Sequence, residues 1–343
     1  MANTYTNLKK LSDKHGAVEF QAEISKETLE HYIMGELAHY AAQMALPGFR
    51  KGKVPHHLVR ERVGEMDLLE GAADEALRDA MRDIVETEKL DALGRPELTV
   101  TKIAPGNPLE FKIKFALAPE VSLPDYKKIA KTVGEKKEDL SVKDAEVDEA
   151  VARIQEMIGT EKKEDGTFTP LTDEDAKKFG PFENVDAFRK ELAKNLTQEK
   201  ELREKDRKRE EMIKEIVAHA KVKIPEMLVE QELREFTDDR DRQIAEAGLS
   251  MEEYLKQTKK TADELAKEER ALIEEDIKTS LVIRAIREQE PSVEPSERDI
   301  QLAIARLKLR NPDRDEASLR RSAESGVIQE KLFAMLEGAA EGK

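Results

Sequence analysis

The sequence predicts an α+β domain at the N-terminus, followed by a mainly α-helical, elongated C-terminal domain. In the first 125 residues, apolar and polar residues alternate over 18–24 and 109–117, which is typical of half-buried strands. From residue 181 onward, apolar residues recur at helical spacing among many Glu, Lys and Arg residues. Hydrophobic residues make up only 38% of the 343 residues, below the usual ~45–50%. A core this small favours extended helices over one compact globule.

The N-terminal elements follow one another in an order that favours an antiparallel sheet. The expected elements are a strand over 18–24, a helix capped by Ser25, a short helix after Pro55, a helix over 67–84 that opens on an Asp67–Glu70 capping box, and strands over 98–103 and 109–117. The last two strands form a hairpin around Pro105-Gly106-Asn107, a strong turn sequence. Strands that are neighbours in sequence are typical of the α+β class.

Three domains are expected along the chain: 1–125, 126–180 and 181–343. The middle one is a charge-dense linker with one short helix over 142–158 and a polar loop over 159–170. The last consists of helices that cover 186–220, a stretch after Pro225, 261–290, a stretch after Ser296, and a final segment around 328–336.

Composition and motif searches exclude several classes of function. The net charge is −15, no cysteine is present, and no run of about 18 apolar residues could span a membrane. The N-terminus lacks an apolar signal region, so the expected compartment is the cytoplasm, with no membrane partner. Phosphate-binding loops and nucleophile motifs are missing. His56 and His57 are adjacent and point in different directions, which makes them poor joint ligands. We therefore expect no catalytic residue, no metal and no cofactor.

One segment, Pro47–Pro55, differs from the acidic remainder of the chain. Residues 47–63 hold five Lys or Arg side chains and one acid. A basic loop on an acidic body suits phosphates or an acidic protein surface. Phe49 beside Arg50 has the composition of a binding hot spot. The alternative is an ordinary inter-helix loop in which Phe49 folds back on the core.

The string Gly48-Phe49-Arg50-Lys51-Gly52-Lys53-Val54-Pro55 resembles the G-F-R-x-G-K-x-P ribosome-docking signature of bacterial trigger factor. Residues 111–121, 171–180 and 223–230 also resemble parts of that family, so the likeness extends over nearly the whole chain. The resemblance implies an ATP-independent chaperone that docks at the ribosomal exit tunnel. There it would contact a large-subunit protein and ribosomal RNA, and it would shield nascent or unfolded polypeptides during folding and export.

Carried onto this sequence, the resemblance makes Phe49, Arg50 and Lys51 the docking contacts, with Gly48 and Gly52 shaping the turn and Lys53 and Pro55 completing the signature. The family also suggests a homodimer off the ribosome. Flexible methionines suit promiscuous binding, although methionine at helical spacing is more often core. The candidate client-binding residues are Met212, Met227, Met251 and Met335.

The chain departs from the family in one large respect. Typical members carry an FKBP-like prolyl isomerase domain between the two ends, and residues 126–180 are too few and too poor in aromatic residues to form one. We therefore expect no isomerase activity. Two alternatives remain: an isomerase with a degenerate domain, or a ribosome-docking scaffold that does not bind clients. A periplasmic chaperone with a similar helical body is disfavoured because no signal region is present.

Overall fold

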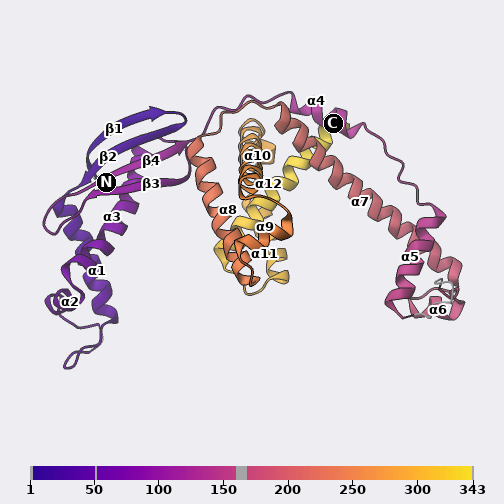
Figure 1. Cartoon of the computed structure of the whole chain (residues 1–343), viewed down its shortest axis with the longest axis horizontal. Coiled ribbons are helices and arrows are strands. Elements are labelled where there is room, and N and C mark those ends of the chain that lie inside the picture. Colours follow the sequence, from indigo (N-terminus) through magenta and orange to yellow (C-terminus); the bar gives the residue numbers. More distant parts are fainter. Residues whose placement is uncertain (1–2, 51, 160–167, 342–343) are drawn as a thin grey trace. The chain divides into compact units, whose positions relative to one another are not determined.

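The computed structural model describes residues 3–50, 52–159 and 168–341. Contacts divide the chain into two compact units, each built from two separate stretches (Figure 1). Unit 1 consists of Met1–Ser122 and Lys221–Ile283, and unit 2 consists of Leu123–Ala220 and Arg284–Lys343. The two units are described separately below.

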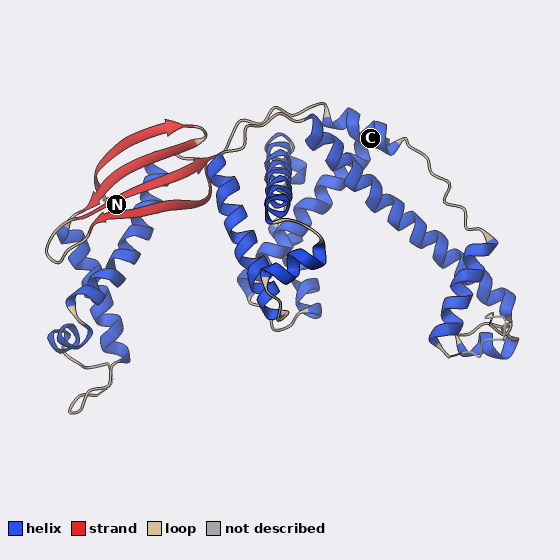
Figure 2. Ribbon diagram, viewed as in Figure 1, coloured by secondary structure: helices blue, strands red, loops and turns tan. Residues whose placement is uncertain are grey.

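Unit 1 combines a four-stranded antiparallel sheet with helices (Figure 2). Its elements are β1 (Thr6–Lys14), β2 (Ala17–Ile24), α1 (Lys26–Gln43), α2 (His56–Val63), α3 (Glu65–Thr87), β3 (Ala92–Lys102), β4 (Leu109–Leu117), α8 (Glu226–Glu246), α9 (Met251–Thr258) and most of α10 (Ala262–Gln289). The strand order is β1-β2-β4-β3, so β1 and β3 are the two edges. This arrangement confirms the predicted α+β class.

The core of the sheet lies where the alternating patterns place it. In β2 and β4 every second side chain is buried, and the partners Phe20 and Ile113 share the face that α1 and α3 cover. Ser25 caps α1 as expected, because its hydroxyl accepts a hydrogen bond from the N–H of Thr28 at 3.1 Å. The predicted capping box at Asp67 is wrong: α3 begins at Glu65 after Gly64, so Asp67 lies inside the first turn.

The sequence did not predict β1. Its residues TNLKKLSDK lack apolar alternation, and most of them are exposed. As an edge strand, β1 pairs only with β2, and its register shifts between Thr6 and Lys9 and again between Lys10 and Ser12. A strand of this kind is held by backbone pairing, which leaves little trace in the hydrophobic pattern.

Unit 2 is helical in its described residues. Its elements are α4 (Tyr126–Gly134), α5 (Asp144–Met157), α6 (Asp173–Lys178), α7 (Val185–His219), the end of α10, a 3₁₀ turn (Pro291–Val293), α11 (Glu297–Arg310) and α12 (Glu316–Glu341). In the part of 126–180 that the structure describes there are three helices, where the sequence predicted one. The first of them, α4, was missed because it buries only Tyr126, Ala130 and Val133 among three lysines. The expected domain boundaries at 125/126 and 180/181 stay a prediction.

Polar contacts hold distant segments of unit 2 together. The Tyr126 hydroxyl donates to the Glu290 carboxylate at 2.8 Å. Burial and this carboxylate raise the pKa of Tyr126 to about 12. Arg209 of α7 binds Glu337 of α12 through Nε and Nη2, and its guanidinium lies 4.9 Å from the centroid of the Phe333 ring. The first contact fixes α4 to the residue that follows α10, and the second fixes α12 against α7.

We expect acid to loosen α11 from α12. Arg320 donates two hydrogen bonds to Glu297, at 2.8 and 2.7 Å, and Lys331 pairs with Asp299 at 2.9 Å. These partners, with Gln301 and Ser296, lower the pKa of each carboxyl to about 2 from ordinary values of 4.5 and 3.8. The folded pKa values are lower than the unfolded ones, so the contribution to stability is complete above about pH 4.5 and is lost as the pH falls toward 2.

Amide hydrogen exchange of α11 across pH 6 to 2.5, corrected for intrinsic rates, measures this loosening. Glu297→Gln should flatten the acid dependence, because it removes one of the two titrating groups. Protection of α11 that stays constant down to pH 2.5 would contradict the prediction.

Candidate functional site: the tip loop

Residues 46–55 join α1 to α2 and form two successive β-turns. In the first turn the Phe49 N–H donates to the Leu46 carbonyl at 3.0 Å. Pro47 occupies the second position and Gly48 the third, where φ is +87°. A type II turn requires a positive φ at its third position, and proline is common at its second. We refer to residues 47–55 as the tip loop.

A second turn with a glycine at its third position follows four residues later. The Lys53 N–H donates to the Arg50 carbonyl at 2.9 Å, and Gly52 stands at the third position with φ +82°. A Cβ added to Gly48 or Gly52 would meet nothing within 4 Å. These positions therefore favour glycine because their φ angles are positive, and not because a larger side chain would clash with a neighbour. Lys51 lies outside the described residues.

The two turns present an aromatic ring beside cations. Phe49 is 41% exposed, and Arg50 and Lys53 are exposed as well. The alternative in which Phe49 folds back on the core is therefore not found. Val54 is buried and anchors the end of the loop, and the half-buried Pro55 is the N-cap of α2.

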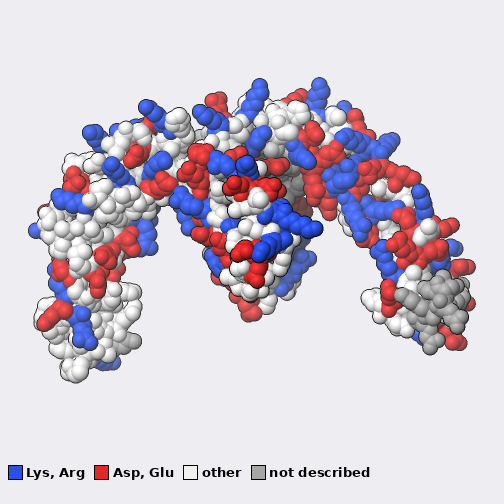
Figure 3. Space-filling view, viewed as in Figure 1, with Lys and Arg blue, Asp and Glu red and all other residues white. Residues whose placement is uncertain are grey.

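The cations of the tip region differ in their availability. Arg60 binds Glu30 at 2.7 Å and Glu65 at 3.1 Å, so it serves the fold. Arg50 and Lys53 form no ion pair with any described residue. Figure 3 shows that the surface around this end of unit 1 is mostly uncharged, with a few basic side chains. An unpaired guanidinium of this kind can bind a carboxylate or a phosphate with two parallel hydrogen bonds.

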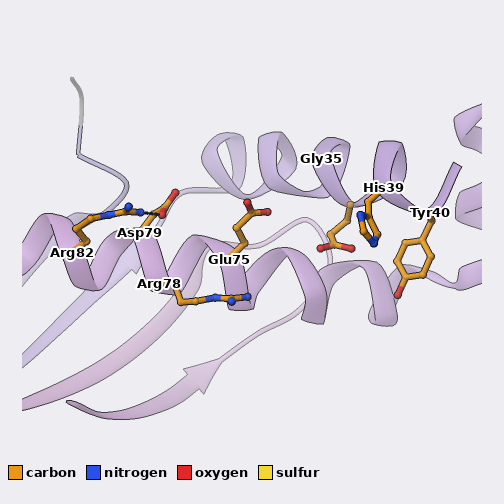
Figure 4. A pocket seen from close by; sticks show the side chains of 8 residues that line it. Gly35, His39, Tyr40, Glu75, Arg78, Asp79 and Arg82 are labelled. Carbon is orange, nitrogen blue, oxygen red and sulfur yellow. Dashed lines mark hydrogen bonds and ion pairs between the residues drawn. The ribbon is translucent and has the colours of Figure 1, made fainter. Parts of the chain in front are cut away.

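Unit 1 also has a groove, away from the tip loop, whose lining residues form no catalytic arrangement. It is an open groove of about 890 Å³ between α1 and α3 (Figure 4). Asp79 on its wall is already bound by Arg82 and accepts a hydrogen bond from the Tyr32 hydroxyl at 2.7 Å. Burial and this contact raise the pKa of Tyr32. Among the described residues no group of three His, Asp or Glu side chains could hold a metal.

The four candidate methionines differ in burial. Met212 and Met227 are 2% and 4% exposed, so they are core residues and cannot act as surface contacts in this conformation. Met251 and Met335 are half-buried. Periodicity did not show which apolar side chains of the helices are exposed; Leu272 was expected on an apolar stripe and is 51% exposed. The exposed set on the helices also includes Met34, Met66, Met157, Leu202, Phe236, Leu302 and Leu309. Their exposure depends on which helix faces another, which spacing alone does not give.

An exposed aromatic and basic loop on an α+β domain, joined to helices that expose single apolar side chains, defines a protein that binds macromolecules. Residues 6–154 match the family model described as bacterial trigger factor protein (TF), and residues 184–321 match the one described as bacterial trigger factor protein (TF) C-terminus. The chain belongs to the bacterial trigger factor family.

Relatives and a solved structure agree with this assignment. The trigger factor of Moorella thermoacetica is 23% identical over 378 residues, which cover 84% of each chain. That of Rhodococcus opacus is 35% identical over 136 residues, 38% of this chain and 28% of the relative. A structure described as "Promiscuous Substrate Recognition in Folding and Assembly Activities of the Trigger Factor Chaperone" covers 97% of this chain and 100% of its own, with TM-score 0.54 and 16% identity. It shows that the fold is shared.

The chain is a short form of the family. The alignment with the Moorella protein has 378 positions, more than the 343 residues of this chain, so the relative carries residues inside the aligned region that have no counterpart here. Residues 155–183 lie between the two matched spans, fewer than the roughly 50 that a small domain needs. No helix among the described residues has the length and apolar character needed to cross a membrane.

Proposed function

We propose that this chaperone holds nascent or unfolded polypeptides without ATP and docks beside the ribosomal exit tunnel through the tip loop. The observation that carries the docking proposal is the exposed Phe49 beside Arg50 and Lys53, on a backbone fixed by two glycine turns. An aromatic ring can fill a pocket on a large-subunit protein, while the cations pair with acidic side chains or ribosomal RNA phosphates. Co-sedimentation with 70S ribosomes tests this docking.

The client-holding part of the proposal is supported by the helices. Leu302 and Leu309 of α11 are 53% and 87% exposed, and both lie among charged neighbours that keep the surface soluble. Single apolar side chains on a polar helix suit many weak contacts with varied sequences. The half-buried Met251 and Met335 remain candidates for such contacts. The cytoplasm as the compartment and a homodimer off the ribosome stay predictions.

We expect the full chain to suppress aggregation of guanidinium-denatured luciferase at stoichiometric ratios in the absence of nucleotide. Light scattering after dilution from denaturant measures this effect. A scaffold without client binding would leave the scattering unchanged, which would refute the holding function. The full chain is required, because unit 1 combines residues before 122 with residues after 221, and a fragment from 126 onward would cut it.

We further propose that the chain has no prolyl isomerase activity. The same preparation, assayed on a proline-containing peptide, should show no turnover above background. Turnover that FKBP-type inhibitors block would support the alternative of an isomerase with a degenerate domain.

A further inference from the structure

The two edges of the sheet in unit 1 differ in how they are protected against pairing with another strand. The β1 edge has Lys9, Lys10 and Lys14 along its length, and charged side chains are a usual means of blocking an exposed edge. Both edge strands shift register twice; in β3 the shifts lie between Leu93 and Glu97 and between Val100 and Lys102. The β3 edge has Leu98-Thr99-Val100-Thr101, which contains neither charge nor proline. These four residues and Lys102 are all exposed.

Helix α8 covers only the first half of the β3 edge. Gln231 donates through Nε2 to the Arg95 carbonyl at 2.6 Å, and Arg234 pairs with Glu97 at 3.3 Å. A Cβ on Gly94 would lie 2.9 Å from the Leu228 side chain, so α8 packs closely there. Among the described residues, no hydrogen bond from outside the sheet reaches residues 98–101. Figure 1 shows β3 as the last strand of the sheet.

The hydrogen-bond pattern shows which backbone groups point to the open side. The Leu117 N–H donates to Gly16, which precedes β2, and the Ala118 N–H donates to Asp91, which precedes β3. Because successive residues of an antiparallel strand point to opposite neighbours, even-numbered residues of β4 face β3 and odd-numbered ones face β2.

The register of β3 then follows from its partners in β4. Thr99 lies opposite Lys112 and pairs with it, whereas Leu98 and Val100 lie opposite Ile113 and Phe111, whose backbone groups face β2. The N–H and C=O groups of Leu98 and Val100 are therefore directed away from β4. Two donors and two acceptors stand in line on this edge, at the spacing that a further β-strand would match.

We propose that the β3 edge at 98–102 binds an extended segment of unfolded polypeptide by adding it to the sheet as a fifth strand. Strand addition relies on main-chain hydrogen bonds, which every client sequence can offer. Leu98 and Val100, 37% and 39% exposed on the core-side face, offer apolar contact to alternate client side chains. This proposal rests on the client-holding function but concerns a separate surface.

The occupant favoured by the size of the edge is a client and not a second copy of this chain. Five strand residues span about 17 Å, and pairing two such edges would bury far less than the roughly 1,200 Å² of a stable interface. A contact this small is weak and reversible, as the release of a client requires.

Amide exchange of the full chain tests the proposal directly. The probe is reduced, carboxymethylated α-lactalbumin, which stays unfolded without denaturant. In the free chain the Leu98 and Val100 amides should exchange quickly and the Thr99 amide slowly. Saturating probe should slow exchange of the Leu98 and Val100 amides at least about fivefold, the effect of one modest hydrogen bond.

Unchanged exchange rates while the probe binds elsewhere would overturn the proposal and leave the chaperone function intact. Failure of the probe to bind at all would instead refute the proposed function.

Two variants of one residue separate backbone from side-chain effects. Val100→Pro removes an edge N–H that β4 does not use, and Pro is tolerated at such positions. It should weaken probe binding about three- to tenfold, whereas Val100→Thr, which keeps the N–H, should not. Equal binding by both variants would refute strand addition.

Protection of the Leu98 and Val100 amides that appears without probe and grows with protein concentration would show a second copy as the occupant and also overturn the proposal. The wild-type exchange data decide the question if Val100→Pro fails to fold.

Discussion

Replacing Phe49, Arg50 and Lys51 with alanine should abolish co-sedimentation of the chain with 70S ribosomes. Hot-spot side chains contribute at least about 2 kcal/mol each, so even one such loss weakens binding about 30-fold. The fold should survive, because Phe49 and Arg50 are exposed and the two glycine turns are unaltered. Wild-type binding should also weaken as salt rises, in proportion to the charge pairs in the contact.

The matched control is Arg62→Ala, which removes an exposed cation from the adjacent helix α2 and leaves the tip loop unchanged. It should retain ribosome binding. Equal binding by the triple variant and the wild type would show that the loop is structural and that the contact lies elsewhere. If neither binds, the chain acts away from the ribosome, and holding of clients in free solution is the remaining function.

Phe188→Ala should unfold the end of unit 2 that contains α5, α6 and the start of α7. This end has its own small core, in which Phe188 is 6% exposed. Its ring stacks on Phe179 at a centroid distance of 5.0 Å and meets Phe182 edge-on at 5.4 Å. Removing a buried phenylalanine costs about 3–5 kcal/mol, which is a large part of the stability that so small a cluster can have.

Hydrogen exchange followed by mass spectrometry distinguishes local from global unfolding. Peptides from α5 should lose protection in Phe188→Ala, while peptides from β4 in unit 1 keep theirs. The matched control is Leu202→Ala, a truncation on the same helix at a side chain that is 64% exposed. A variant that loses protection everywhere, or nowhere, would contradict the idea that this cluster folds as a local unit.

The sequence predicted those parts of the fold that depend on local chemistry. The strands β2 and β4 follow from alternation because one face of each is buried, and α1 and α11 begin at Ser25 and Ser296 because these side chains cap them. The tip loop was predicted from its motif. The motif letters did not give the geometry, in which two positive φ angles hold Phe49 outward.

The parts that could not be predicted depend on contacts distant in sequence. Leu98 and Val100 are exposed because β3 is an edge strand and because α8 contacts only the earlier residues of β3. Neither fact can be read from the sequence of residues 98–102. The burial of Met212 and Met227 likewise depends on which helices meet there. In each case the sequence shows an apolar residue but does not show which residues it contacts in the fold.

The division of each compact unit into two stretches of sequence has a consequence for the synthesis of the chain itself. Tyr126 and Arg209 bind Glu290 and Glu337, so α4 and α7 emerge long before the segment that covers them. Contacts across so many residues are slow to form, and the apolar faces of both helices stay uncovered until the last helix has been translated. While it is being made, this chaperone is therefore a polypeptide of the kind it is proposed to hold, and finished copies docked on the same ribosomes could shelter it.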